Sequence, residues 1–175
     1  MRIGNLFLIT ILFGMMAFVL VGIQQTQTHF EEITPTNEAT EENSNPLFEI
    51  RAKKIDIFFE KIDAPLAGYG KKIVIEAEKN DLHWTILPAI ARVESTGGKF
   101  AYNNNPFGWG KVAFDDFHHA IEVLAVNLGG NNPTTQRWYN NDKTLKQKLR
   151  YYNHVDKDYR KKVLAYMEEI ENIAD

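Results

Sequence analysis

Residues 91–110 read ARVESTGGKFAYNNNPFGWG, and this stretch decides how the rest of the chain is interpreted. An apolar helical run ends in Glu94 and is followed by glycines, three consecutive asparagines and an aromatic, glycine-rich turn. Glu94 follows Ile90 by four residues and Leu87 by seven, so it shares the core-facing side of its helix. Burial and the negative end of the helix dipole both raise the pKa of a carboxyl placed there. Such a carboxyl stays protonated near neutral pH, as a general acid must.

A structural role for Glu94 is the alternative. The carboxylate would then cap or bridge within the fold, with its charge neutralised by Arg92 or Lys99. The two hypotheses differ in what they expect around Glu94: an open cleft in the first case, and a sealed ion pair in the second.

The residues after Glu94 favour a ligand site. Gly97 and Gly98 allow a sharp turn that keeps side chains away from the carboxylate. The asparagines 103–105 supply amides that can bond neutral hydroxyls and N-acetyl groups, and flat aromatic rings can stack on sugar faces. Structural alternatives remain open, because asparagines also form turns and Phe107 and Trp109 also suit the core of a hairpin.

Helical periodicity dominates from residue 46 onward, which predicts a mainly α domain. We expect helices over residues 46–62, 63–79, 84–95, 114–128, 142–152 and 156–173. The only place for strands is the short piece between Lys99 and Phe114, where we expect one small β-hairpin lobe.

The N-terminal residues 1–23 form an apolar segment. Leu6 to Ile23 contains no charged residue, and 18 residues are just enough to cross the hydrocarbon core of a membrane as a helix. No A-x-A-like cleavage site ends this segment, so we expect an uncleaved signal anchor, with a cleavable signal peptide as the alternative. Arg2 precedes the segment, which predicts that the folded domain lies on the extracytoplasmic face of the cell membrane. Residues 24–46 are polar and acidic, which predicts a flexible tether, and the folded domain should span residues 47–175.

Composition excludes several classes of protein. A formal net charge of −3 argues against nucleic acid as a partner, and the absence of cysteine excludes disulfides, thiol nucleophiles and cysteine-based zinc sites. His118 and His119 are adjacent and would point about 100° apart on a helix, so we expect neither a metal nor another cofactor. The basic segment 157–162 is predicted to be a solvated face, with binding of an anionic wall polymer as the alternative. We expect a monomer.

Three segments together resemble the lysozyme-like superfamily of peptidoglycan glycosidases. They are AIARVESTGGKFAYNNNPFGWG at 89–110, FDDFHHAIEVLAVNL at 114–128 and RYYNHVDKDYRKKVLAYMEEI at 150–170. The chain is most similar to the bacterial cell-wall β-N-acetylglucosaminidases (mannosyl-glycoprotein endo-β-N-acetylglucosaminidase-like), which are related to lytic transglycosylases. The resemblance covers about residues 73–170 and implies a lysozyme-like helical domain.

The resemblance also implies roles for individual residues. Glu94 and Tyr152 match the catalytic acid and the tyrosine near it, whereas Tyr159 matches a tyrosine of the last helix that we interpret as a packing residue. The substrate-binding residues implied by the matching motifs are Asn104, Asn105, Phe107 and Asn153. Trp109 and Tyr139 match no motif position and are added as candidate stacking residues.

A second catalytic carboxylate is not evident. Asp115 and Asp116 are the only acids between Glu94 and the next helix, and both are explained as a helix cap. We therefore expect Glu94 to act alone as acid and then base, in either hydrolysis or lytic transglycosylation. The expected function is a membrane-anchored glycosidase that cleaves the β-1,4 glycan of peptidoglycan. The alternative is a catalytically inactive module of the same fold that binds cell-wall glycan.

Overall fold

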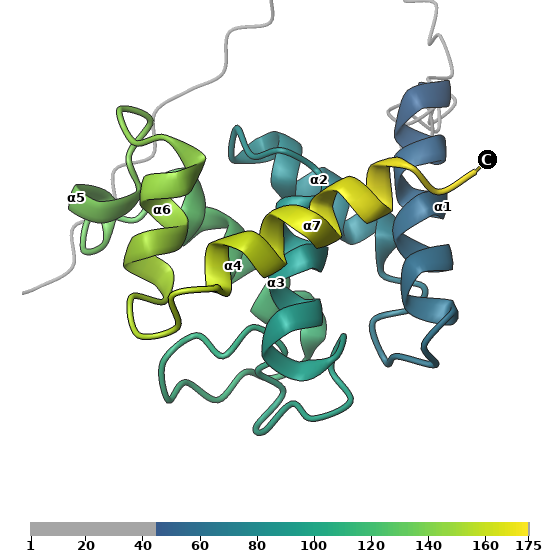
Figure 1. Cartoon of the computed structure of the whole chain (residues 1–175), viewed down its shortest axis with the longest axis horizontal. Helices are drawn as coiled ribbons and strands as arrows, with labels where there is room; N and C mark the ends of the chain where they lie inside the picture. Colours follow the sequence, from purple (N-terminus) through teal and green to yellow (C-terminus); the bar gives the residue numbers. More distant parts are fainter. Residues whose placement is uncertain (1–44, 175) are drawn as a thin grey trace, which may run out of the picture. The chain divides into compact units, whose positions relative to one another are not determined.

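The computed structural model describes residues 45–174, which belong to one compact unit (Figure 1). Within this range the chain forms seven helices and no strand: α1 Pro46–Glu60, α2 Gly70–Lys79, α3 Ile86–Ser95, α4 Phe117–Gly129, α5 Gln136–Tyr139, α6 Leu145–Tyr152 and α7 Tyr159–Glu171. The predicted mainly α class is confirmed. The predicted anchor and nearly all of the tether lie outside the described residues. None of the described helices combines the length and the apolar character needed to cross a bilayer.

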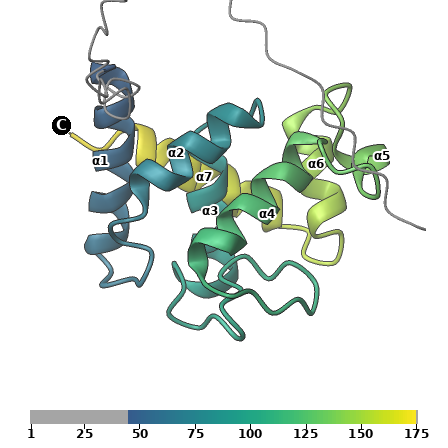
Figure 2. The same ribbon diagram turned by 180° about the vertical axis from the view of Figure 1, so that it is seen from behind.

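Helix α3 is the centre of the helical packing. Its residues from Ile86 to Ala91 are all buried, and it packs against α7 on one side and against α2 and α4 on the other. Figure 1 shows α7 crossing in front of α3, and Figure 2, seen from behind, shows α2 and α4 in front of it. A helix that is apolar on nearly all sides needs such enclosure. Its last turn alone carries polar residues, Arg92, Glu94 and Ser95, and this turn reaches the long loop of residues 96–116.

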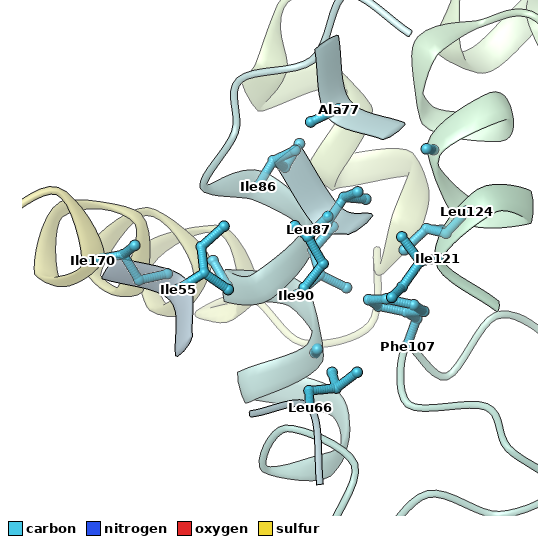
Figure 3. Close-up of a cluster of buried hydrophobic side chains, with 14 of the residues drawn as sticks. Ile55, Leu66, Ala77, Ile86, Leu87, Ile90, Phe107, Ile121, Leu124 and Ile170 are labelled. Carbon is cyan, nitrogen blue, oxygen red and sulfur yellow. The ribbon is translucent and has the colours of Figure 1, made fainter. Parts of the chain in front are cut away.

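The loop of residues 96–116 contributes to the hydrophobic core through Phe107. This side chain is fully buried and lies beside Ile121 of α4 in the apolar cluster of Figure 3. Full burial of a side chain of this size stabilises a fold by about 1.5–3 kcal/mol. Phe107 therefore fastens the middle of the loop to the helices.

The predicted β-hairpin between Lys99 and Phe114 is wrong. The described segment contains only an isolated antiparallel bridge between Tyr102 and Asn105. Asn103 and Asn104 both adopt left-handed backbone angles with φ of 54°, which interrupts any extended strand. Hydrogen bonds from the side-chain amides of the asparagines, and not a ladder between strands, fix the conformation of this loop.

Every predicted helix except α1 begins later than expected, by two residues for α3, by three for α4, α6 and α7, and by seven for α2. Helix α2 begins at Gly70 and not at residue 63, because the carboxylate of Asp56 accepts hydrogen bonds from the backbone N–H groups of Gly68 and Gly70, both at 2.8 Å. These bonds hold residues 61–69 in turns. Helix α7 begins three residues later than expected, and the single-turn helix α5 had no sequence signal long enough to predict it.

Candidate active site

Glu94 lies in the last turn of α3 and lines an open cleft of about 320 Å³. The other wall of the cleft is the loop of residues 100–112, from which Asn105 and the backbone of Gly108 and Gly110 face the cavity. The helix ends directly after Glu94 and Ser95 because Thr96 adopts the left-handed conformation, with φ of 54°. The chain then turns back so that the loop faces the carboxylate.

Glu94 forms no ion pair with any cation of the described residues. The guanidinium carbon of Arg92 lies 5.1 Å from the ring centroid of Tyr166, and the exposed Lys99 has no carboxylate within ion-pair distance among the described residues. Burial raises the pKa of Glu94, and an interaction with the Tyr159 hydroxyl opposes part of this increase. The geometry thus departs from that of a sealed, neutralised carboxylate.

Tyr159 contributes more than the packing predicted for it. Its side chain is almost fully buried, and its hydroxyl forms no hydrogen bond of regular geometry within the described structure. Burial, followed by the neighbouring Tyr152 and Glu94, raises the pKa of Tyr159, so the hydroxyl stays protonated. It is therefore available as a donor to Glu94. Sequence reasoning placed Tyr159 on the inner face of α7, but only the crossing of α7 over α3 brings it to the carboxyl.

Tyr152 shapes the turn that faces Glu94 and does not itself line the cleft. Its hydroxyl donates a hydrogen bond of 2.5 Å to the backbone carbonyl of Phe107. Its ring stacks on Tyr159 with centroids 5.9 Å apart and planes at 10°. Burial raises the pKa of Tyr152, and the charge of Glu94 adds to this effect. In this position Tyr152 fixes the backbone directly before Gly108.

Trp109 faces a second, larger cleft of about 640 Å³ and not the Glu94 cleft. It lines this second cleft with Tyr139, and the two ring centroids lie 5.8 Å apart. Gly108 and Gly110, on either side of Trp109, line the first cleft. The predicted stacking candidates Trp109 and Tyr139 therefore do face a cavity, although Tyr139 is itself largely buried.

The remaining predicted binding residues mainly hold loops. Asn105 both accepts a hydrogen bond from the backbone N–H of Trp109 at 3.0 Å and donates to its carbonyl at 3.2 Å, and it also lines the Glu94 cleft. Asn104 donates to the carbonyl oxygens of Phe114 and Asp115 at 3.1 and 3.0 Å and lines neither cleft.

Two further predicted residues, Phe107 and Asn153, also lie away from both cavities. Phe107 is a core residue with no exposed surface. The Asn153 carboxamide oxygen accepts hydrogen bonds from the backbone N–H groups of Val155 and Asp156, both at 3.1 Å, and so holds the turn before α7.

Ser95 ties the loop to the end of α3. Its buried hydroxyl lies 2.6 Å from the carbonyl oxygen of Pro106 and accepts a hydrogen bond from the N–H of Gly98 at 2.8 Å. The serine beside the glutamate thus holds the start and the middle of the loop against the helix. The functional consequence is that the distance between Glu94 and the turn at Gly108 is fixed.

The two aspartates near the loop do not enter the cleft. Asp116 caps α4 by accepting a hydrogen bond from the N–H of His119 at 2.8 Å, so the predicted cap is confirmed. Asp115 lies 3.2 Å from the His119 imidazole. His118 turns the other way and packs against Tyr69, with ring centroids 4.8 Å apart. Among the described residues, Glu94 is the one acid that lines its cleft.

The site as a whole combines a half-buried carboxyl that no cation of the described residues neutralises, the buried Tyr159, the partly buried Tyr152 and a cleft open to solvent. Such a carboxyl can donate a proton to a neutral ligand bound in the cleft and then accept one back. Comparison with known proteins adds no relative, because no family model, curated protein or solved structure matches the chain at a significant level.

Proposed function

We propose that the protein is a membrane-anchored peptidoglycan glycosidase with a lysozyme-like domain, which cleaves the β-1,4 glycan with Glu94 as general acid and base. The observation that carries the proposal is the open cleft around a half-buried Glu94 whose pKa is raised and whose charge no described cation neutralises. A carboxyl that served only to stabilise the fold would gain from an ion pair or from full solvent exposure.

The cleft surface suits a neutral sugar chain. Phe100 and Tyr102 are 78% and 81% exposed and stand at the Glu94 cleft, where their rings are free to stack on a pyranose face. Asn103 and Asn105 also line the cleft, and amides of this kind bond hydroxyl and N-acetyl groups. Lys111 is the one cation of the described residues that lines this cleft, which is too little positive charge to hold a polyphosphate ligand.

The chemistry follows from a single acid. Glu94 protonates the glycosidic oxygen as the bond from that oxygen to the anomeric carbon breaks, and the leaving sugar departs with the proton. The positive charge that develops on the ring is stabilised by the substrate's own N-acetyl group. The Glu94 carboxylate then takes a proton from the attacking nucleophile. Water as nucleophile gives hydrolysis of the N-acetylglucosaminidase type, and the muramic acid hydroxyl gives lytic transglycosylation.

The predicted N-terminal segments determine where this chemistry acts. An anchor over residues 1–23 would hold the domain on the extracytoplasmic face, and the acidic tether of residues 24–46 would set how far it reaches into the wall.

The proposal is tested with the full chain in detergent micelles, incubated with purified peptidoglycan. Mass spectrometry of the released fragments identifies the products: reducing-end muropeptides establish a hydrolase, and the terminal sugar identifies the bond that is cut. Anhydro products establish a lytic transglycosylase. The absence of any product, with retained binding to the wall, overturns the enzymatic proposal. It would instead support the non-catalytic glycan-binding module, which the single carboxylate of the cleft favours as the second candidate.

Tyr159→Phe tests the contact between the tyrosine and the acid. The hydroxyl lowers the pKa of Glu94, so its removal is expected to raise that pKa further. Because the general acid must be protonated, the alkaline limb of the pH–rate profile is expected to move to higher pH. The buried hydroxyl lacks a regular hydrogen bond, so the phenylalanine variant should fold with wild-type stability. A limb that stays in place or moves to lower pH would contradict the role given to Tyr159.

A further inference from the structure

A second surface of the domain carries a concentration of positive charge. A groove of about 680 Å³ is lined by Lys146 at the start of α6 and by Lys157, Arg160 and Lys161 at the start of α7. We call these four cations and the surface between them the basic groove. Within residues 45–174, Glu168 is the only acid that lines it. The whole chain carries a formal net charge of −3, so this groove stands out against an otherwise acidic protein.

The cations of the basic groove have no ion-pair partner within residues 45–174. Nearby Lys162, by contrast, does form an ion pair: its ammonium group lies 2.8 Å from the Asp156 carboxylate. Asp158 acts on Lys162 as well, which leaves Glu168 as the one acid facing the groove. The four cations thus keep their full charge available for a ligand.

Helix stability does not explain why these cations lie where they do. Arg160 and Lys161 occupy the first turn of α7 and Lys146 the first turn of α6, and neither turn contains an acid. The helix dipole favours acids at that end and disfavours cations. The positive end of α6 therefore adds to the potential of the side chains, whereas Asp156 and Asp158 lie directly before α7 and offset its positive end.

The shape and lining of the groove indicate the kind of anion. Its lining includes no aromatic side chain, and the apolar contribution is confined to Leu164 and a neighbouring alanine. The described lining of the groove therefore cannot stack on sugars or bases. It also has none of the aromatic residues that anchor proteins at a membrane interface. A recessed site with cations on two walls fits a thin charged chain better than a flat bilayer.

Three of the four cations are lysines. A lysine is a compact point charge that binds a phosphate without a fixed geometry, whereas the two-pronged contact of arginine suits planar carboxylates and phosphates alike. Charges from both helices can engage successive monoanionic groups along a flexible polymer. From these observations we propose that the basic groove binds a linear phosphodiester polymer.

The test uses the full chain in micelles of a neutral detergent, with fluorescein-labelled poly(glycerol phosphate) as the probe and fluorescence anisotropy as the measurement. Combined replacement of the three α7-side cations, Lys157→Gln, Arg160→Gln and Lys161→Gln, is expected to raise the Kd by at least about tenfold. The matched control carries Lys53→Gln, Lys61→Gln and Lys99→Gln, which are exposed cations outside the groove. It changes the net charge equally and is expected to leave the Kd within about twofold.

Glu168→Gln tests for stronger binding of the polymer, a result that a folding defect cannot produce. Removal of the one acid is expected to lower the Kd, and Glu94→Gln is expected to leave it unchanged, so the result is independent of the proposed glycosidase activity. Two competitors identify other ligands. Stronger displacement by polyglutamate than by unlabelled polymer would show an acidic polypeptide site, and stronger displacement by phosphatidylglycerol in the micelles would show a lipid headgroup site. Either result, an equal loss in both triple variants, or no binding at all would overturn the proposal.

Discussion

Glu94→Gln is expected to lower kcat for glycan cleavage by about 10³-fold, within the range that a general acid and base contributes. Glutamine keeps the size of the side chain and its ability to hydrogen-bond, but it has no proton to give to the glycosidic oxygen. No other acid of the described residues lines the cleft, so none can take over the proton transfer. The measurement is the initial rate of release of new glycan ends from purified peptidoglycan.

The control for this variant is Glu169→Gln, the same chemical change at an exposed position of α7 that lines neither cleft. Its rate should equal that of the wild type. Glu94→Gln should also bind insoluble peptidoglycan as tightly as the wild type, because the cleft keeps its shape. A Glu94→Gln enzyme that retained a tenth or more of the wild-type kcat would remove Glu94 from the role of acid.

The position of Glu94 was predictable because it depends on local periodicity. Spacing from Leu87 and Ile90 placed the carboxyl on the buried face of its helix, and the structure shows that helix enclosed by α2, α4 and α7. The cap of α4 at Asp116 was predictable for the same reason, since a capping residue acts only on the next few N–H groups.

The loop and the tyrosines were not predictable in this way, because tertiary contacts determine them. Asn105 bonds the backbone of Trp109, and Tyr152 reaches 45 positions back along the chain to the carbonyl of Phe107. These bonds replace the strand ladder that we expected between Lys99 and Phe114. Tyr159 likewise meets Glu94 only because α7 crosses α3, and no local pattern records that crossing.

The same tertiary contacts place the backbone of Gly108 directly against Glu94. A β-carbon built at Gly108 would lie 2.5 Å from one carboxyl oxygen and 3.0 Å from the carboxyl carbon, too close for real atoms. Tyr152 holds the preceding carbonyl and Asn105 holds the following residue, so the turn cannot simply retreat. A side chain at this position must therefore displace the carboxyl group.

Gly108→Ala is accordingly expected to lower kcat/KM by about 100-fold, the effect of moving a catalytic group by about 1 Å. The matched control is Gly110→Ala. Both glycines have left-handed backbone angles, φ of 62° and 56°, so alanine costs each about 1–2 kcal/mol in the free energy of unfolding. A β-carbon at Gly110 meets no atom within 4 Å, so this variant keeps Glu94 in place. Equal thermal stabilities with a large difference in rate would establish that the turn positions the acid. Equal rates would show that Glu94 does not need this position and that the turn has only a structural role.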